Sequence, residues 1–114
     1  MTVRNAATGA VIARRVEVAT THADRAIGLL GRSRLERGEG LLIAPCRGVH
    51  TCFMRFPIDV LELDADGVIV DCTPALRPWR IRLPRPRSVS VLELPAGTIA
   101  FTSTRVGDKV RLDP

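Results

Sequence analysis

The chain has 114 residues, of which 46% are hydrophobic, and a formal net charge of +5 at pH 7. Its length fits one domain, so we expect residues 1–114 to fold around a single core. The apolar content excludes a disordered polar chain, and no apolar run approaches the roughly 20 residues that cross a bilayer, so we expect no membrane role.

The cysteines and cations suggest a compartment and a kind of partner. The chain has three cysteines, Cys46, Cys52 and Cys72. An odd number suits a reducing compartment better than a disulfide framework. The first residues also lack an apolar signal core, so we expect a cytoplasmic protein. All but one of the 17 cations are arginines, which bind carboxylates and phosphates bidentately. A GC-rich genome explains this basic composition equally well.

The first half of the chain predicts short strands and one main helix. Two strands, 2–5 and 11–19, flank a turn that contains Gly9. Residues 21–30 predict the helix, because a capping-box-like start precedes apolar residues spaced i, i+3, i+4 and i+7. Further strands are predicted at 41–44 and, with a break at Pro57, at 50–64.

The second half is again mainly strand. Asp64-Ala65-Asp66-Gly67 lies between two apolar runs and predicts a β-hairpin. After a long structured loop at 75–87 come a strand at 89–94, a short helical turn at about 97–102 and a last strand at 109–112. These elements predict an α+β, mainly β fold: a small antiparallel, partly closed β-barrel-like sheet with one main helix.

Six segments in order, together spanning most of the chain, resemble a bacterial and archaeal family, domain of unknown function 192. The resemblance implies a compact β-rich domain with a helix and implies no activity. This chain has Phe53-Met54-Arg55-Phe56 where many members have Trp-Met-Lys-Asn-Thr. The matching segments are Arg25 with Gly28-Leu29 and Arg32; Leu35 with Gly40-Leu41-Leu42; Phe53-Met54 with Pro57-Ile58-Asp59; Asp64 to Val68; Val91 to Gly97; and Val106 to Val110.

Metal binding is one candidate chemistry. On a strand, His50 and Cys52 project to the same face, and zinc accepts three cysteines and one histidine. The sequence lacks the paired Cys-x2–4-Cys knuckle of structural zinc sites, and free cysteines are commonly buried as small apolar residues. We therefore predict neither a metal nor another cofactor, and the only metal candidates are Cys46, His50, Cys52 and Cys72.

Nucleophilic catalysis is a second candidate. His50 with Cys52 or Asp59 supplies the residue types of a base, a nucleophile and an orienting carboxylate. However, no nucleophile-elbow, zinc-protease or phosphate-loop motif occurs. A hydrolase-like enzyme that uses His50 with Cys52 or Asp59 is therefore an alternative to a non-enzymatic protein.

Residues 77–87 hold five arginines and Trp79. Arginine and an indole face are suited to phosphate binding, base stacking and cation–π contacts. Nucleic-acid binding through 77–87 is thus a further alternative, although no nucleic-acid-binding module is recognisable. In the other interpretation, Trp79 closes one end of the barrel and the arginines pair with surface glutamates.

Asp59 and Glu93 lie within apolar, strand-like runs. A buried carboxylate is costly without partners. We expect ion pairs with Arg25, Arg32 or Arg55 to fix the strand register.

The preferred hypothesis is a non-catalytic binding or accessory module that recognises an anionic small molecule or an acidic protein partner. Histidine, threonine and arginine donors beside one indole suit an oriented anion. The hypothesis requires that two segments fold against one another and line a shallow cleft. These residues are His50, Thr51, Arg55 and Asp59 on one side, with Arg77, Trp79 and Arg80 on the other.

Overall fold

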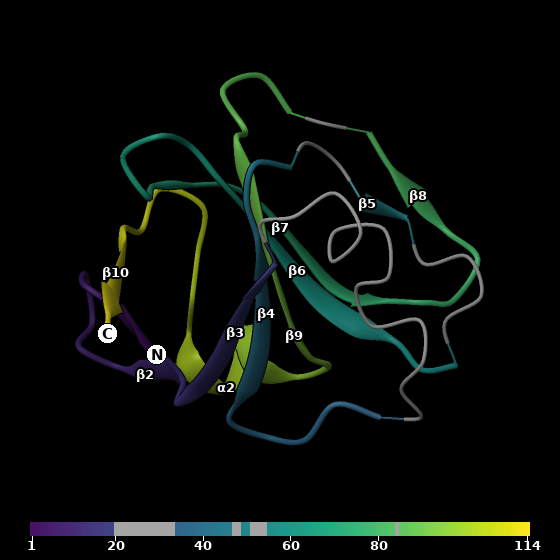
Figure 1. Ribbon diagram of the computed structural model, residues 1–114, viewed down its shortest axis with the longest axis horizontal. Helices are drawn as coiled ribbons and strands as arrows, with labels where there is room; N and C mark the ends of the chain where they lie inside the picture. Colours follow the sequence, from purple (N-terminus) through teal and green to yellow (C-terminus); the bar gives the residue numbers. More distant parts are fainter. Residues whose placement is uncertain (20–33, 47–48, 51–54, 84) are drawn as a thin grey trace.

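A computed structural model describes residues 1–19, 34–46, 49–50, 55–83 and 85–114 (Figure 1). Ten strands and one short helix occupy this part of the chain. In chain order they are β1 (Thr2–Asn5), β2 (Val11–Ala13), β3 (Arg15–Ala19), β4 (Glu39–Ile43), β5 (Val49–His50), β6 (Ile58–Leu63), β7 (Ile69–Leu76), β8 (Ile81–Arg82), β9 (Ser90–Pro95), α2 (Thr98–Thr102) and β10 (Val110–Asp113).

A five-stranded sheet, in the order β3-β4-β9-β6-β7, forms the centre of the molecule. Its pairs are antiparallel except β3 and β4, which run parallel in register from Arg15↔Glu39 to Ala19↔Ile43. A parallel pair needs a long crossover, which residues 20–38 supply. The all-antiparallel sheet that the sequence predicts is corrected at this pair.

Strand β6 lies between β9 and β7 in the sheet and is buried on both faces. Its residues alternate between two apolar cores, because successive strand side chains point to opposite faces. Leu61 and Leu63 join the first core, which also contains residues of the three-stranded sheet β10-β1-β2. Ile58 and Val60 join the second core, on the other face, with Leu41.

The arrangement is three sheets and a short helix, and the described strands do not close into a barrel. The α+β, mainly β fold predicted from the sequence is confirmed, as is a short helix near 97–102. The predicted main helix at 21–30 lies outside the described residues. Among the residues that the structure describes, no helix has the length and apolarity to span a bilayer.

The β6–β7 hairpin forms where the sequence predicts it. Asp64 Oδ1 accepts hydrogen bonds from the backbone N–H groups of Asp66, at 2.8 Å, and Val68, at 2.9 Å. Gly67 has a φ of +82°, the left-handed region that glycine adopts most easily. The local chemistry of this turn therefore sets the position of the hairpin.

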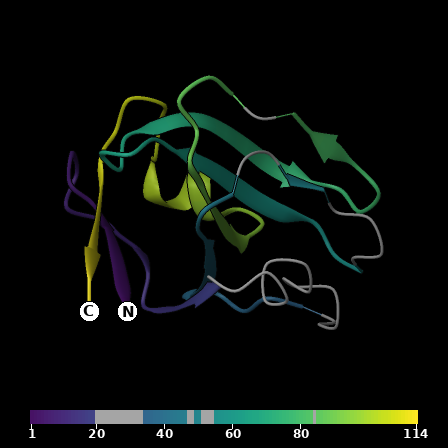
Figure 2. The same ribbon diagram turned by 45° about the horizontal axis from the view of Figure 1, so that its top comes forward.

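A two-stranded sheet of β5 and β8 lies at the end of the molecule opposite to the two chain termini (Figures 1 and 2). The termini lie near each other because β1 pairs with β10. β8 therefore extends the molecule away from the sheet that holds the termini.

Candidate functional site

The pairing of β5 with β8 brings together the two segments that the sequence singles out. Val49 lies opposite Arg82, and His50 lies opposite Ile81, in an antiparallel register. The backbone of His50 is therefore beside the arginine-rich segment, about 30 residues further along the chain. We call residues 77–83 the basic ribbon.

The basic ribbon exposes a mixture of apolar and cationic side chains. Trp79, Ile81 and Leu83 are 58%, 69% and 76% exposed. Arg77 and Arg80 are also exposed, and no Asp or Glu occurs between Asp71 and Glu93. Trp79 has a φ of +64°, and its carbonyl accepts a hydrogen bond of 3.5 Å from Arg80 Nη1. Large exposed apolar side chains that adjoin one another mark interaction surfaces.

Asp59 is part of the scaffold and does not line an open surface. Its side chain is fully buried. Oδ1 accepts from the backbone N–H of Ala75 and Oδ2 from that of Ile99, each at 2.8 Å. These bonds tie β6 to β7 and to α2, so backbone donors take the place of the expected arginine partner. With both oxygens occupied, Asp59 is not placed to orient a catalytic histidine.

The other predicted site residues divide between described and undescribed parts of the chain. Arg55 is exposed, and within the described residues no hydrogen bond or ion pair joins it to the basic ribbon. Thr51 and Cys52 lie outside the described residues, and His50 is placed through its backbone alone. Of the predicted cleft, the structure therefore brings His50 beside the segment of Arg77, Trp79 and Arg80.

The candidate metal ligands do not all meet at one place. Cys46 packs against the second core and Cys72 against the first, on opposite faces of the central sheet. Burial, together with the charges of Asp71, Asp108 and Asp59, raises the pKa of the Cys72 thiol to about 11. A thiol with such a pKa is protonated at neutral pH and is a poor nucleophile and metal ligand. Cys46 and Cys72 therefore do not share one ion.

Two buried glutamates on the second core's face form a feature that the sequence shows only in part. Glu93 is 4% exposed, and burial raises its pKa to about 7. Glu62, 1% exposed, accepts a 3.3 Å hydrogen bond from Ser88 Oγ through Oε1. Its Oε2 has no hydrogen-bond partner among the described residues. The period of β6 could have indicated Glu62, because Ile58 and Val60, which precede it on the same face of the strand, are apolar.

Three comparisons with known proteins bear on this arrangement. The model of the DUF192 family, described as an uncharacterized ACR, matches residues 3–112. A UPF0127 protein of Pyrococcus abyssi is 37% identical over 102 residues, 84% of each chain. One of Pyrococcus horikoshii is 33% identical over 101 residues, 84% of this chain and 85% of the relative.

Two solved structures share the fold. A protein of unknown function from Novosphingobium aromaticivorans has a TM-score of 0.82 at 27% identity, over 97% of this chain and 82% of its own. A chain from Sinorhizobium meliloti has a TM-score of 0.78 at 24% identity, over 96% of this chain and 89% of its own. Because the family model matches residues 3–112, nearly the whole of this chain, the chain belongs to the DUF192 family.

Proposed function

We propose that this protein is a non-catalytic accessory module that binds an acidic segment of a partner protein through the basic ribbon. The observation that carries the proposal is the β5–β8 pairing, which sets His50 beside exposed Trp79, Ile81 and Leu83. We place the module in the cytoplasm, in keeping with its three cysteines.

The chemistry of the ribbon supports an acidic and partly apolar partner. Its exposed arginines attract carboxylates, and a guanidinium group can bind both oxygens of one carboxylate. Trp79, Ile81 and Leu83 occupy alternate positions, so a partner in an extended conformation can match them with apolar side chains. A protein segment that alternates acidic and apolar residues fits both features.

The geometry of β8 supports the same partner. Among the described residues, β8 pairs with β5 alone, so it is one edge of a two-stranded sheet. An edge strand binds an extended peptide through backbone hydrogen bonds, and the side chains supply specificity. The side chains of Ile81 and Leu83 face solvent, an arrangement that suits a partner surface better than an enclosed small-molecule cavity.

The test uses the sole tryptophan of the chain, Trp79, as the reporter. We expect a peptide of alternating Glu and Val to change the Trp79 emission and to bind with an affinity that falls as salt rises. Arg77→Ala with Arg80→Ala should weaken binding about tenfold or more, since charge-assisted hydrogen bonds are lost. Arg105→Ala, which removes an exposed arginine outside the ribbon, is the matched control.

Two results would overturn the proposal. One is equal affinity for a peptide of alternating Gln and Val, which removes the charge but keeps the shape. The other is tighter binding of single-stranded DNA than of the acidic peptide, with the same loss on substitution of Arg77 and Arg80. That second result would assign the ribbon to nucleic acid instead.

A further inference from the structure

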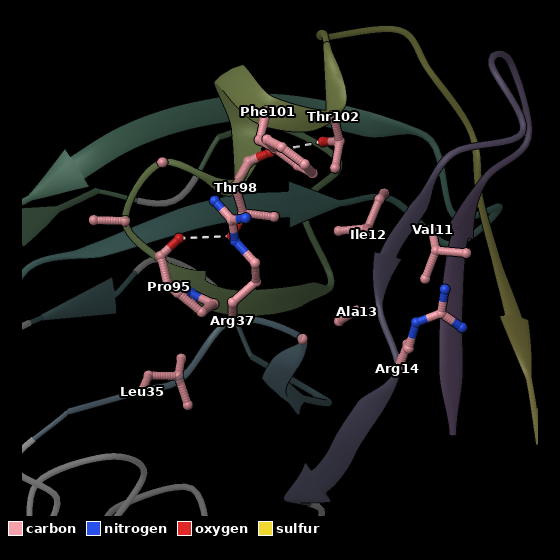
Figure 3. Close-up of a pocket in the computed structure, with 13 residues that line it drawn as sticks. Val11, Ile12, Ala13, Arg14, Leu35, Arg37, Pro95, Thr98, Phe101 and Thr102 are labelled. Atoms are coloured by element: carbon pink, nitrogen blue, oxygen red, sulfur yellow. Dashed lines mark hydrogen bonds between the residues drawn. The ribbon is translucent and has the colours of Figure 1, made fainter.

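A hollow of about 430 Å³ opens between β2, the turn before α2 and the segment that leads into β4 (Figure 3). This volume lies within the range of small-molecule pockets in proteins. It is independent of the basic ribbon, because its lining includes no residue of 77–83. No sequence motif indicates the hollow, because its walls come from three distant segments.

The floor of the hollow is apolar. Ile12, Ala13 and Leu35 line it and are buried, and Phe101 lines its rim with 71% of its surface exposed. An aromatic residue this exposed, beside an apolar floor, offers contact area that a ligand could cover. The hollow is therefore suited to the apolar body of a small organic molecule.

Among the described residues that line the hollow, the charged side chains are those of Arg14 and Arg37. Neither forms an ion pair with an acidic side chain among the described residues. Two guanidinium groups beside a hollow without a carboxylate favour an anion there. In Figure 3 the Arg37 side chain points toward Phe101, while Arg14 lies beside Val11.

The stacking of Arg37 on Phe101 holds one guanidinium in a defined position. Arg37 Cζ lies 4.4 Å from the centre of the Phe101 ring. A guanidinium that stacks through its face keeps the N–H groups in its plane available for a bidentate contact. Because this contact already restricts the Arg37 side chain, less conformational entropy is lost when an anion binds to it.

The hydroxyl groups of the lining are already engaged, so the arginines are the side-chain donors that remain among the described residues. Thr98 Oγ1 donates to the carbonyl of Pro95 at 2.8 Å, and Thr102 Oγ1 lies 2.7 Å from the carbonyl of Thr98 (Figure 3). A ligand here thus requires an acceptor that matches guanidinium. A carboxylate does so as a monoanion, which is easier to remove from water beside an apolar floor than a phosphate dianion.

We infer that this hollow binds a small organic carboxylate, whose apolar body contacts Ile12, Leu35 and Phe101 and whose carboxylate binds Arg37, with Arg14 adding positive charge. The body should have about the size of one ring and a short chain, given the volume of the hollow.

The probe is 3-phenylpropionate, titrated into the intact chain and followed by the NMR shifts of the Ile12 and Leu35 methyl groups and of the amides of 95–102. We expect saturable shifts with a Kd of about 0.1–1 mM, as for a ligand of this size. Its neutral amide and acetate should each bind at least tenfold more weakly, because one lacks the charge and the other the apolar body.

Substitutions in the lining separate recognition from loss of folding. Arg37→Ala should weaken binding about tenfold, and Phe101→Leu, which keeps an apolar side chain but removes the stacked ring, should weaken it severalfold. Arg34→Ala removes a neighbouring exposed arginine that pairs with Glu36 at 2.7 Å, and it should leave binding unchanged. Both arginines are exposed, so the variants should keep the thermal stability of the wild type.

Three outcomes would overturn the inference: equal binding of the amide, unchanged binding in Arg37→Ala, or shifts confined to residues outside the hollow. A parallel titration with phenyl phosphate tests whether the site prefers a carboxylate or a phosphate ester. If phenyl phosphate binds more tightly than 3-phenylpropionate and depends on Arg37, the site takes phosphate esters and the carboxylate assignment is wrong.

Discussion

Asp59 determines the path of the chain into the basic ribbon through two hydrogen bonds. Its Oδ1 accepts from Ala75, a residue with a φ of +47° in the last part of β7. A non-glycine residue in this region is strained by roughly 1 kcal/mol or more, so the bond stabilises a backbone turn that would otherwise be unfavourable. The ribbon begins two residues later at Arg77. A buried carboxylate thus positions the ribbon from inside the core.

Replacing Asp59 with asparagine should destabilise the protein by about 2–3 kcal/mol. Asparagine keeps one acceptor but puts an amide N–H₂ against the N–H of Ala75 or of Ile99, and the charge-assisted bonds are lost. Urea unfolding of Asp59→Asn against the wild type measures the change in free energy. Asp66→Asn, at an exposed position in the hairpin turn, is the control and should change it little. An unchanged midpoint for Asp59→Asn would show that these two bonds contribute nothing net.

At the scale of elements, the sequence predicts best what local chemistry decides. The hairpin at Asp64 to Gly67 and the short helix after Gly97 were predicted because Asp and Gly determine the backbone of their own turns. The parallel pairing of β3 with β4 was not predicted, because it depends on how the chain crosses over between the two strands, and no local sequence pattern indicates this. The segments of His50 and Trp79 were predicted to lie together, but their pairing as strands was not, because β5 and β8 have two residues each and are too short to carry a periodic pattern.

The same limit applies to the candidate site. The residue types of the ribbon were recognisable because five arginines and one tryptophan stand together in the sequence. The hydrogen-bond donors to Asp59 could not be recognised in the same way. Backbone N–H groups occur at almost every residue, and only the fold brings those of Ala75 and Ile99 to Asp59. The hollow beside Arg37 is assembled from three segments and has no counterpart in any short stretch.

Gly67 links the hairpin to the last strand, so a methyl group there should disturb two elements. A Cβ at Gly67 would lie 3.1 Å from the carbonyl oxygen of Val110, and the residue keeps its φ of +82°. We expect Gly67→Ala to cost about 2 kcal/mol or more of unfolding free energy. Gly9→Ala is the matched control, since Gly9 has a φ of +79° with nothing within 4 Å of its Cβ position. It should cost about 1 kcal/mol, and equal losses in the two variants would contradict a role for the Val110 contact.

At the scale of the whole molecule, the central sheet separates two cores of different polarity. The first core contains Asp59, whose oxygens are both hydrogen-bonded. The second core's face carries Glu62 and Glu93, and Asp71 lies opposite Glu62 in the β6–β7 register. Carboxylates gathered on one buried face couple the ionisation of the protein to its folding. The stability of the molecule should therefore depend on pH in a direction that Glu93 sets.

Glu93 should make the protein less stable as the pH rises from about 4.5 to 7. Its pKa is 4.5 in the ordinary state and about 7 when buried in the fold, so in this window the folded protein holds a proton that the unfolded chain has lost. Below pH 4.5 Glu93 is protonated in both the folded and the unfolded state, so its ionisation does not lower the free energy of unfolding. Above pH 7 Glu93 is ionised in both states, and the whole cost of its buried charge is subtracted from the free energy of unfolding. A displacement of this size corresponds to about 3 kcal/mol.

Glu93→Gln, which cannot ionise, should match the wild type at pH 4 and be more stable by up to about 3 kcal/mol at pH 8, because it never carries the buried charge. Urea unfolding at pH 4, 6 and 8 measures the difference between the two proteins at each pH. Glu17→Gln, at an exposed position on β3, is the control and should run parallel to the wild type. Parallel curves for Glu93→Gln and the wild type would mean that Glu93 ionises in the fold as easily as in the unfolded chain.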